Sequence, residues 1–138
     1  MTLYKNHHVS INVTDIDNST KFYKILGFVE VYRYADDSVT IVHLLNQNFL
    51  IELFRYSNAP QTKSIPNDVE HSDIIGIDHF SLQVDDIHEA FEELKNYSDC
   101  SNVSRGRTEI DYFFIADPDN NRIEIVKDTR RLHRFKLS

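Results

Sequence analysis

The sequence predicts an α+β fold made of two tandem βαβββ modules, and three observations lead to this prediction. Short runs rich in β-branched and aromatic residues alternate with two amphipathic helical segments. Residues 78–87 repeat residues 7–16, with His79 lying 71 residues after His8. The triplet around Glu124 repeats the triplet around Glu52 at a spacing of 72 residues. Because the two spacings agree within one residue, they indicate an internal duplication.

The first module reads in order as a strand, a helix and three strands. Thr14 and Asp15 are helix-capping residues, and Gly27 is typical of a helix end. They predict a helix over residues 16–26, with an apolar stripe of Ile16, Ser19, Phe22, Ile25 and Leu26. Strands are predicted over residues 8–13, 28–34, 39–45 and 49–55, with turns at 35–38 and 46–48. Alternation within the second of these strands predicts one face formed by Phe28, Glu30, Tyr32 and Tyr34.

The second module follows the same order. A helix is predicted over residues 86–97, with the stripe Ile87, Ala90, Phe91 and Leu94. Strands are predicted over residues 78–84, 102–107, 110–116 and 122–127, and an aspartate-proline turn over 117–121. We therefore expect a single domain, residues 1–138, with module one at 7–55, a linker at 56–76, module two at 77–128 and a basic tail at 129–138.

Composition limits the possible partners. The chain has 138 residues and a formal net charge of −7, which argues against a nucleic-acid-binding protein with a broad basic surface. No apolar run approaches the length of a membrane span, and no apolar signal region precedes His7. The one cysteine, Cys100, excludes an internal disulfide and fits a reducing compartment. We expect a cytoplasmic protein with a small-molecule substrate and neither nucleic acid nor membrane as a partner.

The candidate site comes from two glutamates that lie inside apolar strands. An ionised Glu52 or Glu124 in such a place is costly unless something compensates its charge. The repeat pairs these glutamates with His8 and His79, and two imidazoles with two carboxylates suit a divalent transition metal. Such a ligand set leaves coordination positions for water or substrate. Taken singly, a strand histidine or glutamate is more often a hydrogen-bonded or solvent-facing residue, so the duplication carries the prediction.

The remaining five histidines are less suitable as ligands. His7 is a competing ligand, but His8 is preferred because its spacing to His79 agrees with the flanking matches. Four histidines have no counterpart in the other half and are interpreted as surface or packing residues: His43, His71, His88 and His133.

These motifs together resemble the vicinal oxygen chelate superfamily, and within it the glyoxalase I-like, or lactoylglutathione lyase-like, proteins. The resemblance rests on the double βαβββ unit, on His8 and His79 opening their modules, on Glu52 and Glu124, on the helix-end segment 22–28 and on the aspartate-proline turn. It covers nearly all of residues 8–127. Bleomycin resistance proteins and dioxygenases share the same fold.

The resemblance implies modules that curl into an incomplete mixed β-barrel around the metal, and a homodimer in many members. It implies nickel, zinc, cobalt or manganese bound by His8, Glu52, His79 and Glu124. The implied reaction moves a proton between adjacent carbons of a small α-oxo thiol adduct, such as the hemithioacetal of methylglyoxal and glutathione. Glu124 is the expected general base and Glu52 the alternative.

Two features leave the substrate open. Residues 105–109 do not form the glycine-rich loop expected of a close glyoxalase I, and Arg33, Arg105 and Arg107 are candidates for binding a thiol's carboxylates without matching family positions. One alternative is a metal-free ligand-sequestering protein of the antibiotic-resistance type. Another is a metal-dependent epimerase or dioxygenase.

Overall fold

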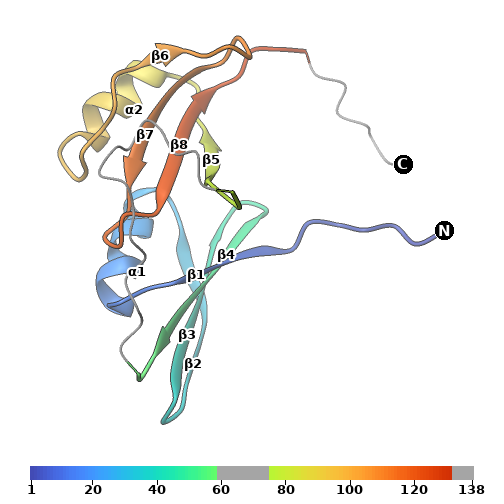
Figure 1. Ribbon diagram of the computed structural model, residues 1–138, viewed down its shortest axis with the longest axis vertical. Coiled ribbons are helices and arrows are strands. Elements are labelled where there is room, and N and C mark those ends of the chain that lie inside the picture. The colour runs from blue at the N-terminus through green and yellow to red at the C-terminus, as the bar shows by residue number, and fades with distance from the viewer. Residues whose placement is uncertain (59–74, 132–138) are drawn as a thin grey trace. The chain divides into compact units, whose positions relative to one another are not determined.

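The computed structural model describes residues 1–58 and 75–131 and divides into two compact units (Figure 1). Unit one comprises Met1–Ser64 with Asp117–Asp119, and unit two comprises Ile65–Ala116 with Asn120–Ser138. Each unit has one four-stranded mixed sheet and one helix, and the described strands close into no barrel. The predicted α+β fold with two modules is therefore confirmed. Most of the predicted linker and the end of the basic tail, including His71 and His133, lie outside the described residues.

The sheet of unit one has the strand order β1-β4-β3-β2. Strand β1 is parallel to β4, whereas β3 is antiparallel to both β4 and β2. The elements are β1 (His8–Asn12), α1 (Ile16–Ile25), β2 (Val29–Ala35), β3 (Val39–Asn46) and β4 (Phe49–Tyr56).

The sheet of unit two has the equivalent order, β5-β8-β7-β6, and β5 is again parallel to β8. The elements are β5 (His79–Gln83), α2 (Ile87–Leu94), β6 (Ser104–Arg105), β7 (Asp111–Ala116) and β8 (Arg122–Lys127). The strand predicted over residues 102–107 is thus reduced to two residues. The duplication seen in the sequence is matched by a duplicated topology.

Both helices begin at the predicted aspartates. The Asp15 side chain accepts a hydrogen bond from the Asn18 N–H (2.9 Å), and Asp86 accepts from the N–H groups of His88 and Glu89. Helix α1 ends before Gly27, whose φ of +91° is in the left-handed region that favours glycine.

The core of each unit lies between its helix and one face of its sheet. In unit one the fully buried strand residues are Val42, Leu44, Ile51 and Leu53, and in unit two they are Phe113, Ile115, Ile123 and Ile125. Because side chains alternate along a strand, Glu52 and Glu124 lie on the opposite face of each sheet from these core residues. The glutamates are therefore part-buried strand residues on the face that the helix does not cover.

The predicted stripe of α1 is wrong at one position. Ile25 is 44% exposed, whereas Tyr23 is fully buried and its hydroxyl donates to Asp117 Oδ2 at 2.7 Å. A helix near its end can turn an apolar residue outward, and Tyr23 is buried because a carboxylate accepts its hydroxyl. Burial, and then Asp117, raise the pKa of Tyr23 above its ordinary value.

The predicted face of β2 is also wrong, because the strand contains a bulge at Val31. Glu30 lies opposite Leu44 in β3, but the register then shifts and Tyr32 lies opposite His43. Since Leu44 is in the core and His43 is on the other face, Glu30 and Tyr32 lie on opposite faces of the sheet.

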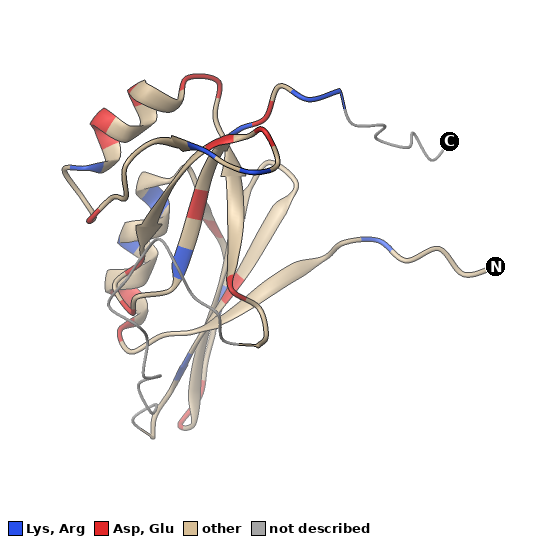
Figure 2. Cartoon of the chain, turned by 45° about the horizontal axis from the view of Figure 1, so that its top comes forward, with Lys and Arg blue, Asp and Glu red and all other residues tan. Residues whose placement is uncertain are grey.

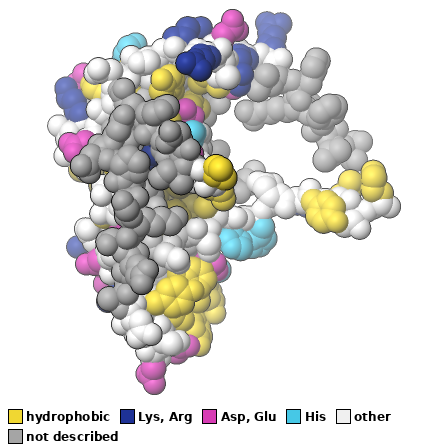
Figure 3. Space-filling model, viewed as in Figure 1, with side chains coloured by type: hydrophobic (Ala, Val, Ile, Leu, Met, Phe, Trp, Pro, Cys, Tyr) yellow, Lys and Arg dark blue, Asp and Glu magenta, His cyan; other side chains and the backbone are white. Residues whose placement is uncertain are grey.

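Apolar side chains remain exposed along the edge strand β2 and at the end of β4. The exposed residues are Val29, Val31, Tyr32, Tyr34 and Tyr56. Figure 3 shows hydrophobic side chains gathered over the part of unit one where β2, β3 and β4 lie.

Charged residues of both signs are interspersed over the helices, strands and turns of both units (Figure 2). Within the described segments, no helix has the length and apolarity needed to cross a membrane.

Candidate functional site

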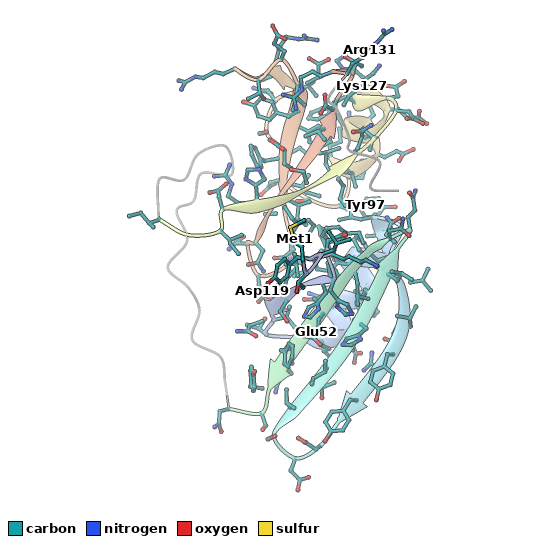
Figure 4. All side chains as sticks on the ribbon, turned by 90° about the vertical axis from the view of Figure 1, so that its right-hand side faces the viewer. Met1, Glu52, Tyr97, Asp119, Lys127 and Arg131 are labelled. Carbon is teal, nitrogen blue, oxygen red and sulfur yellow. The ribbon has the colours of Figure 1, made fainter. Side chains whose placement is uncertain are left out.

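Strands β1 and β4 bring His8 and Glu52 together in unit one. Ser10 lies opposite Glu52 in the parallel register, and His8 is two residues earlier on the same face. The Ser10 hydroxyl donates to Glu52 Oε1 at 2.7 Å, and His8 Nε2 lies 3.4 Å from the same oxygen. Glu52 lies near the middle of the sheet, as labelled in Figure 4. One predicted His–Glu pair is therefore assembled by strand pairing within unit one.

The second carboxylate oxygen of Glu52 is held by a residue that sequence reasoning missed. His43 lies directly opposite Glu52 in the β3–β4 register, and its Nε2 is 2.7 Å from Glu52 Oε2. Burial raises the pKa of Glu52, but the hydrogen bonds from Ser10 and His43 outweigh burial and leave this pKa below its ordinary value. Glu52 is thus an ionised carboxylate with both oxygens engaged.

The prediction that His43 is a surface or packing residue is corrected by this contact. The turn between β3 and β4 decides which residues face each other, and this turn is one residue shorter than predicted. The predicted three-residue turn at 46–48 would place His43 opposite Ile51. In the structure Asn46 pairs with Phe49, the turn has two residues, and Gln47 takes a positive φ of 52°.

Strands β5 and β8 assemble the equivalent pair in unit two. Ser81 lies opposite Glu124 in the parallel register and donates to its Oε1 at 2.7 Å. His79 Nε2 lies 3.6 Å from the same oxygen. The residue opposite Glu124 on the antiparallel side is Phe114, in the place that His43 occupies in unit one. Unit two therefore repeats the serine, histidine and glutamate, and has Phe114 at the register position of the second histidine.

The chemistry of each pair fits a divalent metal. Two ligands bonded to one ion at about 2.1 Å with a tetrahedral angle lie about 3.4 Å apart. The His Nε2 to Glu Oε1 distances are 3.4 Å in unit one and 3.6 Å in unit two. In both pairs the nitrogen is Nε2, and Nδ1 has another partner: His7 Nδ1 for His8 and Asp78 Oδ2 for His79. Each unit thus carries an imidazole and a carboxylate at a spacing suited to two ligands of one ion.

The structure brings the predicted ligands together as these two pairs, each within its own unit. In residues 1–58 and 75–131, no group of three or more His, Cys, Asp or Glu side chains is arranged to hold a metal ion. The competing ligand His7 contacts His8 at 2.7 Å, from Nδ1 to Nδ1, and is itself exposed.

Of the three arginine candidates for substrate binding, two contact carboxylates and the third is exposed. Arg33 binds Glu30 at 2.8 Å and Asp17 at 3.4 Å, on the helix-covered side of the sheet. Arg105 donates to Asp111 at 3.0 Å. Arg107 is exposed in the turn before β7. Arg33 therefore lies on the face away from Glu52.

A sequence profile of the Glyoxalase/Bleomycin resistance protein/Dioxygenase superfamily matches residues 5–125. Two curated relatives are similar to nearly the whole chain. The uncharacterized protein YaeR of Escherichia coli strain K12 is 34% identical over 127 residues, covering 88% of this chain and 94% of its own. The uncharacterized protein YwkD of Bacillus subtilis strain 168 is 28% identical over 133 residues, covering 92% and 99%.

Solved structures share the fold. The crystal structure of SMU.1112c has a TM-score of 0.78 at 25% identity, covering 91% of this chain and 100% of the other. More distant neighbours of the same fold are a trypanothione-dependent glyoxalase I of Leishmania major (TM-score 0.68), the fosfomycin resistance protein FosX of Listeria monocytogenes (0.72) and a bleomycin-binding protein (0.58). These three are 20%, 18% and 18% identical to the chain.

Proposed function

Because the chain belongs to the Glyoxalase/Bleomycin resistance protein/Dioxygenase superfamily, we propose that it is a metal-dependent lyase or isomerase of the glyoxalase I type. The superfamily includes enzymes such as glyoxalase, and its members commonly use divalent metals. One observation supports the proposal most strongly: the serine, histidine and glutamate of one half-site recur at the same strand register in the other. A protein without a metal has no evident need for the same histidine and carboxylate in both halves.

In this proposal His8, Glu52, His79 and Glu124 supply the ligands of a divalent ion, with nickel, zinc, cobalt and manganese as the candidates. A bound ion supplies electrophilic polarisation of a substrate oxygen. The protein's own contribution is to fix the ligands: Ser10 and Ser81 each donate to the Oε1 of the glutamate opposite.

Glu124 is the general base in this proposal. Both oxygens of Glu52 accept hydrogen bonds, one from Ser10 and one from His43. Glu124 accepts one from Ser81 on Oε1, and in the described part of the chain Oε2 has no hydrogen-bond donor. A carboxylate oxygen without a donor is better suited to take a proton from carbon, so Glu52, the alternative base, is the less suitable of the two.

The reaction proposed is a redox-neutral isomerisation of a small α-oxo thiol adduct, such as a methylglyoxal hemithioacetal. Glu124 removes the proton from the hydroxyl-bearing carbon next to sulfur and returns it to the adjacent carbonyl carbon. The hydroxyl proton on the carbon next to sulfur passes to the neighbouring carbonyl oxygen. The carbon next to sulfur thereby becomes a thioester carbonyl, and its neighbour becomes an alcohol.

The first test is the metal content of the purified protein, measured by inductively coupled plasma mass spectrometry, with Glu124→Gln as the variant. We expect about one divalent ion per set of the four proposed ligands in the wild type and a loss of occupancy in the variant. Glu30→Gln is the matched control, because Glu30 is also a part-buried strand glutamate but lies on the helix-covered face. A wild type without nickel, zinc, cobalt or manganese would contradict the enzyme proposal.

That outcome would favour the alternative, a metal-free ligand-sequestering protein, and a structural neighbour of the same fold is a bleomycin-binding protein. A metal-loaded protein that does not turn over methylglyoxal with any thiol tested would instead point to another metal-dependent activity, such as an epimerase or a dioxygenase. Metal content and turnover therefore separate the three candidates.

We also propose that residues 1–138 act as one domain, that the protein is a homodimer and that it works in the cytoplasm. Superfamily members often act as dimers. The exposed apolar side chains of the edge strand, Val29, Val31, Tyr32 and Tyr34, support a second copy as the partner. Light scattering after size-exclusion chromatography tests the homodimer, and a monomeric mass at every concentration would contradict it.

A further inference from the structure

His79 is held by a chain of residues that starts next to it in sequence. Its Nδ1 lies 2.6 Å from Asp78 Oδ2. The other carboxylate oxygen of Asp78, Oδ1, lies 3.5 Å from Arg122 Nη1. The guanidinium of Arg122 in turn lies over the ring of Phe114, 4.2 Å from its centroid. Asp78 therefore connects a candidate metal ligand to a cation in the neighbouring strand.

Arg122 is a suitable anchor because it is fixed and buried. It lies opposite His79 in the β5–β8 register, and its side chain is only 7% exposed. Its Nε and Nη1 are buried without a hydrogen-bond acceptor among the described residues, so the ion pair with Asp78 and the face of Phe114 are its electrostatic partners. A buried guanidinium that lost Asp78 would be left as an uncompensated charge, and this keeps the two together.

The contact with Asp78 determines how His79 presents its nitrogens. A carboxylate accepts hydrogen bonds, so the contact assigns the donor role to His79 Nδ1 and makes Nε2 the nitrogen available to a metal. Nε2 is the nitrogen 3.6 Å from Glu124 Oε1. The ring of Phe114 packs edge-on against His79, with centroids 5.0 Å apart, and limits rotation of the imidazole.

The described residues of unit one lack this arrangement. The residue before His8 is His7, which is not a fixed anion, and the residue opposite His8 in the register is Leu50. The two histidines of the duplicated site therefore differ in how firmly they are held.

We propose that Asp78, anchored by Arg122, is a positioning residue that fixes His79 with Nε2 as the metal-binding nitrogen. This inference rests on the proposed function, because it gives His79 the role of a metal ligand. Carboxylates that accept from the far nitrogen of a metal-bound histidine orient the ring and raise its basicity.

The first experiment measures the affinity of the full chain for zinc and nickel by competition with a chromophoric chelator. Asp78→Asn keeps an acceptor oxygen but removes the charge, and Asp78→Ala removes both. We expect a loss of about tenfold for Asp78→Asn and up to about 100-fold for Asp78→Ala. Asp111→Asn is the matched control, because Asp111 also pairs with an arginine in unit two and its side chain is 32% exposed against 29% for Asp78. Wild-type affinity in Asp78→Ala would overturn the proposal.

The second experiment reads the His79 ring without metal, by two-dimensional nitrogen–proton NMR of the imidazoles, with His79→Gln to assign the signal. We expect His79 to be protonated on Nδ1 in the wild type and in Asp111→Asn. In Asp78→Ala we expect it to move toward the Nε2-protonated form. An Nε2-protonated His79 in the wild type would overturn the proposal. If the wild type binds no metal but shows the expected tautomer shift, the proposed function fails while the positioning of His79 by Asp78 is supported.

Discussion

The hydrogen bond between Tyr23 and Asp117 allows a quantitative test of what holds unit one together. Replacing Tyr23 by Phe removes a 2.7 Å hydrogen bond to a carboxylate while keeping the ring in its fully buried site. Hydrogen bonds to charged groups contribute about 1.5–3 kcal/mol, and we expect Tyr23→Phe to lower the free energy of unfolding by about 2 kcal/mol. With a urea dependence of about 2 kcal/mol per molar, the unfolding midpoint falls by about 1 M.

The assay is urea unfolding followed by far-ultraviolet circular dichroism, with Tyr34→Phe as the control. Tyr34 also donates to an aspartate, Asp36, at 2.9 Å, but on the exposed surface, where the same change should hardly move the midpoint. Because the folded state raises the pKa of Tyr23, its contribution is complete below the ordinary value of 10.0 and is lost as the pH rises above it. Equal midpoint shifts for the two variants at pH 7 would refute this reasoning.

Three further predictions concern other described residues. Hydrogen bonds hold the pKa of Asp36 at about 2, below its ordinary value of 3.8. The stability difference between wild type and Asp36→Asn should therefore be constant above about pH 5 and shrink as the pH falls toward 2. Thermal unfolding across that pH range measures this difference. Gly27→Ala should lower the free energy of unfolding by about 1–2 kcal/mol in urea titrations. The reasons are that φ at Gly27 is +91° and that a Cβ there would lie 3.0 Å from Asn46 Nδ2. An unchanged unfolding midpoint would show that α1 can end with a different backbone conformation. His43→Phe places in unit one the residue found at this register in unit two. It should weaken metal binding about tenfold in the chelator competition, because Glu52 loses a hydrogen-bond partner. Tighter binding would mean that His43 competes with the metal ion for Glu52.

Much of the fold follows from local signals in the sequence. Asp15 and Asp86 cap the two helices because each is followed by exposed N–H groups that need an acceptor, and this chemistry depends on a few adjacent residues. The repeat was visible because its landmarks are strand residues at a fixed spacing. The pairs His8–Glu52 and His79–Glu124 were predicted from that repeat, and the structure places each pair within hydrogen-bonded parallel strands.

The contacts that could not be predicted from the sequence are those that depend on strand register. The bulge at Val31 moves Tyr32 to the face opposite Glu30, and no residue type within β2 predicts a bulge there. His43 was missed because one residue of turn length decides which face it occupies. The role of Asp78 and Arg122 likewise depends on a parallel pairing between strands about 40 residues apart, which no local pattern specifies.

The parallel pairing of the first and last strands of each unit also bears on the order in which the unit forms. Strands β2, β3 and β4 follow one another through short turns, so their antiparallel contacts close small loops. The parallel pairing of β1 with β4 closes a larger loop, and we expect it to form later than these antiparallel contacts. We therefore expect His8 to meet Glu52, and His79 to meet Glu124, late in the folding of each unit. Ion binding by these residues would then report that the parallel pairing in each sheet has formed.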